Sequence, residues 1–244
     1  MESLSINASE LVHPPNPFYP LNTEVVGYLA NEWSVPTLLG MFTAGWVIIL
    51  GATNAMVTRH NPTLPGIEKA TILWFVLSGT IHLFFEGYFS YNHTRMGAAQ
   101  DLFGQLWKEY ALSDSRYLTS DPFVLCMETV TAVCWGPLSF LVAWLITTQH
   151  PLRYPLQAIV SSGQIYGDIL YYATSMFDHY HKGLTYCRPE AYYFWGYYFS
   201  MNFIWIVIPG ILLYNSVDAT ARAFRALDKM SAKLQANGYA KKSG

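Results

Sequence analysis

Long apolar runs separated by short polar segments dominate the chain from residue 35 onward. The runs cover residues 35–58, 67–91, 123–148, 152–176 and 192–214. Each is long enough for a helix that crosses a bilayer, which takes about 20 residues. In lipid every backbone polar group must be satisfied within the segment, so such runs are helical unless they form a closed barrel. The pattern predicts an all-α polytopic membrane protein, a bundle of five transmembrane helices.

The polar segments divide the chain into three parts. Residues 1–33 form a Pro-rich lead, which cannot be one continuous helix. Residues 34–217 form the transmembrane domain, and residues 218–244 form a basic, amphipathic tail. Within the domain, 92–122 mixes charges with aromatic residues, which favours an ordered cap over a flexible tether. A second loop is expected through residues 178–182, and a kink at Gly136-Pro137.

Composition agrees with a membrane location. Hydrophobic residues make up 52% of the chain and charged residues only 12%, against about 25% charged in soluble domains. A net charge of −2 gives no sign of a nucleic-acid partner. The three cysteines have no metal-ligand spacing, and Cys126 and Cys134, in one apolar run, are expected to be small core residues. We predict no metal and no cofactor.

Basic residues predict the orientation, because the cytoplasmic side of a membrane protein carries the excess of Lys and Arg. One end of the bundle would carry Arg59, Lys69, Arg153, Arg222, Arg225, Lys229, Lys233, Lys241 and Lys242. The other end would carry Arg95, Lys108, Arg116, Lys182 and Arg188. The asymmetry puts the N-terminus in the lumen and the C-terminus in the cytosol. Lys241-Lys242 near a cytosolic C-terminus resembles an endoplasmic-reticulum retrieval signal. The same two residues also fit an ordinary solvated run of charges.

The most informative polar residues are His82 and Glu86, inside the second apolar run. Four residues apart on a helix, they share one face. Ionisable side chains at membrane depth are costly and usually belong to functional sites with buried partners. Candidate partners on the other runs are Glu128, Thr131, Gln164, Asp168, Asn202 and Trp205.

Depth along the helices brings these candidates together. At about 1.5 Å per residue, they lie roughly 7 to 21 Å below the lumenal surface. Glu86 and Glu128 share one depth, and two neighbouring carboxylates repel unless a proton or cation lies between them. Asn202 and Trp205 share a helix face, where Asn202 could anchor a charged group.

Structural readings stay open beside the functional ones. His82 alone also fits a core histidine, Thr131 a packing hydroxyl, and Trp205 a packing aromatic. Asp168 fits a partner of interfacial Tyr or Trp donors equally well. Taken together, two carboxylates, a histidine and an indole around an apolar cavity suit a cation without a polar shell. A His–Glu pair can also move a proton. The expected chemistry is cofactor-free proton transfer on a lipophilic substrate.

Eight ordered segments between residues 74 and 210 resemble one known family. They are IHLFFEGYF, QLWKEYALSDSRY, CMETVTA, WGPLS, QHPLR, GQIYGD, YFW and MNFIW…PG. In these segments the chain is similar to the emopamil-binding proteins, the 3β-hydroxysteroid Δ8,Δ7-isomerases of the EXPERA superfamily. The loop with His179, His181 and Cys187 departs from the family pattern, which leaves the substrate open.

The resemblance implies a five-helix protein of the endoplasmic-reticulum membrane, often a homodimer, with a sterol cavity inside the membrane and affinity for lipophilic cationic amines. It implies an isomerase that protonates the Δ8 double bond at carbon 9, forms a cation at carbon 8 and removes a proton from carbon 7. By motif match the catalytic residues are His82, Glu86, Glu128, Thr131, Asn202 and Trp205. Gln164, Asp168 and Arg116 are candidate substrate contacts, and Arg116 is also expected to brace the lumenal cap.

Two other functions fit less well. A related carbocation isomerase or cyclase acting on a terpenoid, as in some fungal relatives, would need the same acid and the same cation-stabilising wall. A non-catalytic protein that binds sterols or amphiphilic amines would need only the carboxylates. Retention of His82, Asn202 and Trp205 beside the carboxylates favours catalysis.

Overall fold

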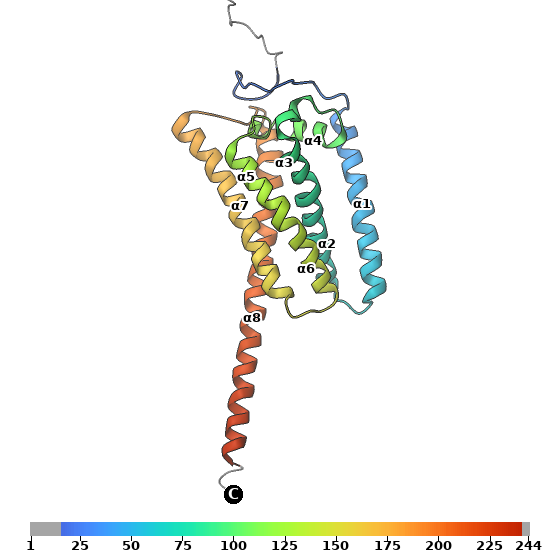
Figure 1. The fold of residues 1–244 in the computed structure, drawn as a ribbon, viewed down its shortest axis with the longest axis vertical. Helices are drawn as coiled ribbons and strands as arrows, with labels where there is room; N and C mark the ends of the chain where they lie inside the picture. The colour runs from blue at the N-terminus through green and yellow to red at the C-terminus, as the bar shows by residue number, and fades with distance from the viewer. Residues whose placement is uncertain (1–15, 241–244) are drawn as a thin grey trace, which may run out of the picture.

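All regular structure within residues 16–240, the part of the chain that the computed structural model describes, is helical (Figure 1). Four stretches are long and apolar enough to cross a membrane: Val35–His60, Gly66–Ala98, Pro122–Thr147 and Tyr193–Gln235. This confirms an all-helical membrane protein. The fifth predicted run is also a helix, α7 (Arg153–Lys182). Its many polar residues make it less apolar than the other four stretches, so length and composition alone do not identify it as a membrane span.

Local sequence explains where the helices begin and end. The Ser34 hydroxyl caps α1 (Val35–His60) by accepting from the Thr37 amide, and a proline follows in the first turn. Asp121 caps α5 (Pro122–Val130) through the Val124 amide at 3.0 Å. Helix α7 ends at Gly183, whose positive φ of 67° suits glycine.

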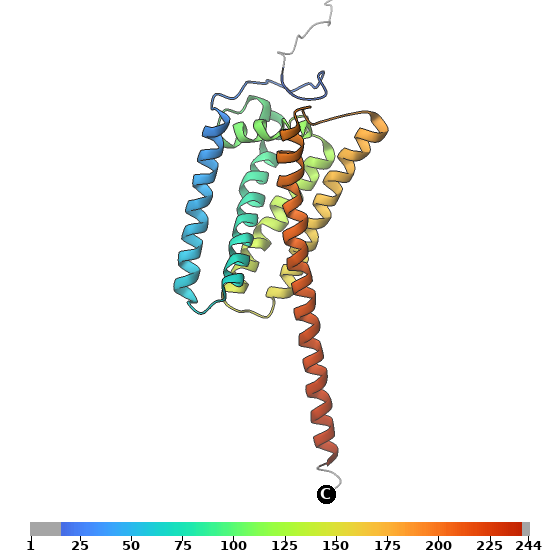
Figure 2. The same cartoon turned by 180° about the vertical axis from the view of Figure 1, so that it is seen from behind.

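The helices run side by side along one axis (Figures 1 and 2). Helix α2 (Gly66–Thr80) packs against α6 (Gly136–Thr147), and α7 packs against α8 (Met201–Ala240). Helix α1 lies at the edge and buries only Leu38 and Val57. Helix α8 continues well past the other helices, so the predicted basic tail from residue 218 extends the last span without a break.

Three π-helical turns interrupt the bundle helices. They are η1 (Ile81–Glu86), which leads into α3 (Gly87–Asn92), η4 (Thr131–Trp135) between α5 and α6, and η5 (Tyr193–Ser200) before α8. The π-turn η4 directly precedes Gly136-Pro137, where a kink was predicted, and Pro137 has no N–H to continue an α-helical ladder. π-turns occur often at functional sites, and all three contain or adjoin candidate residues.

A glycine lets two of these turns approach closely. A Cβ on Gly136 would lie 2.9 Å from the backbone nitrogen of Leu83, closer than real side chains allow. The η1 and η4 turns are in direct contact for this reason. The close approach places the end of α5 and the start of η4 next to His82 and Glu86.

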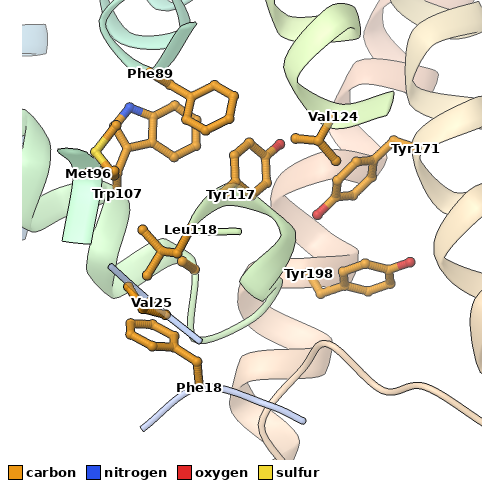
Figure 3. Packing of buried hydrophobic residues seen from close by; sticks show 11 residues of the cluster. Phe18, Val25, Phe89, Met96, Trp107, Tyr117, Leu118, Val124, Tyr171 and Tyr198 are labelled. Carbon is orange, nitrogen blue, oxygen red and sulfur yellow. The ribbon is translucent and has the colours of Figure 1, made fainter. Parts of the chain in front are cut away.

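The segment 92–122 forms an ordered cap, as predicted. It contains η2 (His93–Ala98), α4 (Leu102–Tyr110) and η3 (Ser115–Tyr117), and the described part of the lead lies across it. Phe18 and Val25 of the lead join Trp107 and Tyr117 in one buried cluster (Figure 3). Lys108 is buried here and donates to the Leu29 carbonyl at 2.7 Å, and this burial lowers its pKa to about 8.

Two expectations were wrong. Residues 178–182 are not a loop but the last turn of α7, because the helix continues to Lys182 and Gly183 is the residue that ends it. His179 and His181 are nevertheless exposed, as expected. Cys126 and Cys134 are not core residues but lie exposed on the outer surface. In a membrane protein the outward face is as apolar as the interior, so an apolar neighbourhood in the sequence does not reveal which face is buried.

Candidate active site

His82 occupies the centre of the candidate site and is 3% exposed. Its Nδ1 lies 2.8 Å from Glu86 Oε2, and its Nε2 lies 3.0 Å from the amide nitrogen of Gln164 on α7. Nδ1 thus faces the Glu86 carboxyl group and Nε2 faces the Gln164 amide. The ring is held between two helices, with one nitrogen placed to exchange a proton with a carboxyl group.

Glu86 and Glu128 come from different helices, line the same two cavities and lie close enough for their charges to interact. Glu128 is 4% exposed, and its Oε1 accepts from the Tyr117 hydroxyl at 2.7 Å. Two neighbouring buried carboxylates repel each other, so the site favours a shared proton or a cation beside them. The pair can thus both donate a proton and stabilise a positive charge.

Trp205 and Asn202 present one face of α8 to this site. The Trp205 ring lies 4.9 Å from the His82 ring and 4.9 Å from the Trp74 ring, between centroids. Asn202 was expected to anchor a charged group, but its amide bonds the Tyr110 hydroxyl and donates to the Tyr198 carbonyl at 2.6 Å. Its neutral partners tie α8 to the cap.

A small polar cavity of about 60 Å³ brings eight of the nine predicted residues together. They are His82, Glu86, Glu128, Thr131, Gln164, Asp168, Asn202 and Trp205. Thr131 reaches the cavity while its hydroxyl donates to the Met127 carbonyl at 2.8 Å. The candidates selected by depth along separate helices therefore share one cavity.

A larger, mainly apolar cavity of about 320 Å³ adjoins the first. Five residues line both cavities: Glu86, Tyr117, Glu128, Asn202 and Trp205. The larger cavity is otherwise lined mostly by apolar side chains, among them Leu39, Phe42, Phe85, Trp107 and Ile204. The carboxyl pair and the indole thus form the wall between a polar and an apolar space.

Arg116 is the predicted residue that lines neither cavity. It is 1% exposed in the cap, where Nη2 lies 2.6 Å from Asp114 Oδ2 and Nη1 donates to Thr174 at 2.9 Å. Burial disfavours its charge, but the Asp114 carboxylate outweighs this and raises the pKa of Arg116 above its usual value. Arg116 therefore braces the cap against α7, as the sequence also suggested.

Two tyrosines of the cap were missed as site residues. Tyr117 bonds Glu128, and Tyr110 bonds Asn202. Both belong to the segment QLWKEYALSDSRY, from which only Arg116 was selected. A phenol is a usual interfacial residue in membrane proteins, so its type carried no signal; only its place in that segment could have indicated a role.

The sequence profile of the EBP family, described as EXPERA (EXPanded EBP superfamily), matches residues 102–216. A 3-beta-hydroxysteroid-Delta(8),Delta(7)-isomerase of Rattus norvegicus is 37% identical over 226 residues, which is 91% of this chain and 96% of the relative. The chain belongs to the EBP family.

Members of the EBP family carry different names. A protoglabretal synthase of Citrus sinensis is 32% identical, covering 75% of this chain and 80% of its own length. An isomeliandiol synthase of Ailanthus altissima is 32% identical, covering 85% of this chain and 92% of its own length. Membership of the family therefore leaves the product to be argued from the site.

Proposed function

We propose that this protein is a sterol Δ8-Δ7 isomerase that moves a ring double bond inside the membrane. The observation that carries the proposal is the pair of buried carboxyl groups, Glu86 and Glu128, on the wall of an apolar cavity. At about 320 Å³ that cavity falls within the range of small-molecule sites, about 300–1,000 Å³. The name of the rat relative, which aligns over most of its length, supports the sterol substrate.

The reaction needs one proton in and one proton out. The carboxyl pair, coupled to His82, gives a proton to carbon 9; the C8=C9 π electrons form the new C–H bond and leave a cation at carbon 8. Loss of the proton at carbon 7 to the same group of bases returns the electron pair as the C7=C8 bond. Carboxylate charge and the Trp205 indole stabilise the cation between the two steps. Because the acids and His82 share protons, the group acts as one titrating unit.

Conversion of a Δ8-sterol by the purified protein in detergent tests this function. We expect a Δ7-sterol as product, and in cells lacking the protein we expect Δ8-sterols to accumulate. An unchanged sterol profile together with no conversion would contradict the proposal. Turnover of another polycyclic substrate would then favour the second candidate, a related carbocation isomerase or cyclase. The names of the Citrus and Ailanthus relatives support this candidate. Binding without turnover would favour a sterol- or amine-binding protein.

The transmembrane domain is proposed to span residues 34–217 and to use α7 as its fifth helix. Thirty residues of α-helix extend about 45 Å, enough for a hydrocarbon core of about 30 Å. Its polar residues Gln157, Ser161, Gln164 and Asp168 are buried against the bundle rather than turned to lipid, which removes the usual objection to a polar span.

Five spans put the two ends of the chain on opposite sides, with the N-terminus and cap lumenal and the C-terminus cytosolic. The excess of basic residues along the C-terminal part of α8 and around the α1–α2 and α6–α7 connections motivates this orientation. In intact microsomes, protease should remove a C-terminal tag and leave a tag before residue 16 protected. A protected C-terminal tag would contradict the orientation.

Two further partners follow from the same proposal. A lipophilic tertiary amine would place its ammonium between Glu86 and Glu128, in the position of the cation. A homodimer in the endoplasmic-reticulum membrane stays a prediction, which the mass of the solubilised protein and its cellular location would check. Lys241-Lys242, the predicted retrieval signal, lies outside the described residues.

A further inference from the structure

Two residues of α7 that line the polar cavity each carry a buried side-chain oxygen without a partner. Asp168 Oδ2 and Gln164 Oε1 have no hydrogen-bond donor among the residues that the structure describes. The two residues are four apart and share one helix face, and both line the cavity. A buried polar atom without a partner is unfavourable, so a donor beside these acceptors would stabilise the site.

Water is the donor that fits the space. A buried water molecule needs roughly 10–15 Å³ of cavity volume and two to four polar partners. The cavity of about 60 Å³ has room for a few water molecules, and polar side chains from several helices line it. Besides Gln164 and Asp168, it is lined by His82, Glu86 and Glu128, which hold the protons of the proposed reaction.

The position of Asp168 separates it from the substrate. The apolar cavity, where the sterol is proposed to lie, is lined by Glu86 and Glu128 but not by Asp168, Gln164 or His82. Asp168 is therefore reached from the polar cavity and not from the apolar one. From this place it can exchange protons with the groups that face the sterol.

The isomerisation needs a group that can redistribute protons after each turnover. Each turnover leaves the acid one proton short and the base with one proton too many, and the two must be reset before the next substrate. We propose that Asp168 and water in the polar cavity form a proton relay that resets the carboxyl pair and His82. The proton taken from carbon 7 then mixes with a local store, which is the exchangeable protons of Asp168 and the cavity water. Asp168 acts through this relay as a positioning residue. The inference rests on the proposed isomerase function.

Two substitutions test the relay in different ways. Asp168→Asn keeps the shape but removes the exchangeable acid. Gly167→Ala adds a methyl group to the cavity wall, where its Cβ would meet only Met127 at 3.9 Å, an ordinary contact. Alanine also favours the helix over glycine, so this variant should fold at least as well as the wild type. The matched controls are Asp178→Asn, on α7 outside both cavities, and Gly210→Ala, where the Cβ would enter open space.

The measurement is deuterium at carbon 9 of the product during repeated turnover in D2O. With the relay, protons from carbon 7 are diluted in the store and the wild-type product stays deuterium-rich. Without it, they pass directly to the next substrate, so Asp168→Asn and Gly167→Ala should lower the deuterium content about twofold or more after about ten turnovers, with turnover reduced about tenfold, less than for a direct acid or base. Both controls should match the wild type.

Wild-type deuterium content in folded, active Gly167→Ala and Asp168→Asn would overturn the relay and leave the isomerase proposal standing. If Asp168→Asn turns over too slowly to label, the Gly167→Ala result decides. No conversion of a Δ8-sterol by the wild type would instead overturn the isomerase function, and the relay with it.

Discussion

Glu128→Gln is expected to lower conversion of a Δ8-sterol by about 10² to 10⁴-fold, the usual contribution of a positioned proton-transfer group. Glutamine has nearly the same shape and can still accept from Tyr117, as Glu128 Oε1 does at 2.7 Å. It carries no negative charge for the cation and cannot share a proton with Glu86. Turnover per folded protein, measured in detergent, checks this. Glu68→Gln is the control, because Glu68 pairs with Arg153 at the opposite end of the bundle.

The same variant should distinguish ligands by charge. A tertiary amine should lose more affinity than a neutral sterol, because only the amine places a positive charge between the two carboxyl groups. Competition of both ligands against a labelled inhibitor measures the difference. Equal loss for the two ligands would show that Glu128 is only a structural acceptor for Tyr117.

Trp205→Leu is expected to slow turnover by roughly 30-fold or more while substrate affinity changes less. A desolvated cation–π contact contributes about 2 kcal/mol or more, and this energy applies only where charge develops, in the transition state. Trp205 lines both cavities, and its ring lies 4.9 Å from the His82 ring. Trp205→Phe should keep part of the rate, because a benzene face is a weaker version of the same quadrupole. Purified variants, normalised to folded protein, provide kcat and KM.

Trp74 provides the matched control for packing. Its ring contacts the Trp205 ring at 4.9 Å, it is buried, and it lines neither of the two site cavities. Trp74→Leu should therefore lower stability or expression more than turnover per folded molecule. Normal turnover in Trp205→Leu, or equal losses in Trp205→Leu and Trp74→Leu, would falsify the cation-stabilising role of Trp205.

Much of the helical architecture follows from the sequence alone. Apolar runs of bilayer length must be helices, because lipid provides no partner for backbone N–H and C=O groups. Ser34, Asp121 and Gly183 then mark helix ends through local hydrogen bonds and backbone preference. Rare ionisable residues such as Glu86 and Glu128 could be selected because lipid makes them costly, and their depth follows from counting residues along each helix.

The faces and contacts of the helices required the tertiary structure. Cys126 and Cys134 were misplaced because lipid and protein interior are equally apolar, so hydrophobicity does not identify the buried face. The π-turns η1 and η4 meet where Gly136 admits a neighbouring backbone, a contact between segments about fifty residues apart. Only this packing reveals that Gln164 meets His82, that Tyr117 holds Glu128, and that the carboxyl pair separates a polar from an apolar cavity. These relations depend on side chains from different helices meeting at one point, and periodicity along a single helix carries no information about its neighbours.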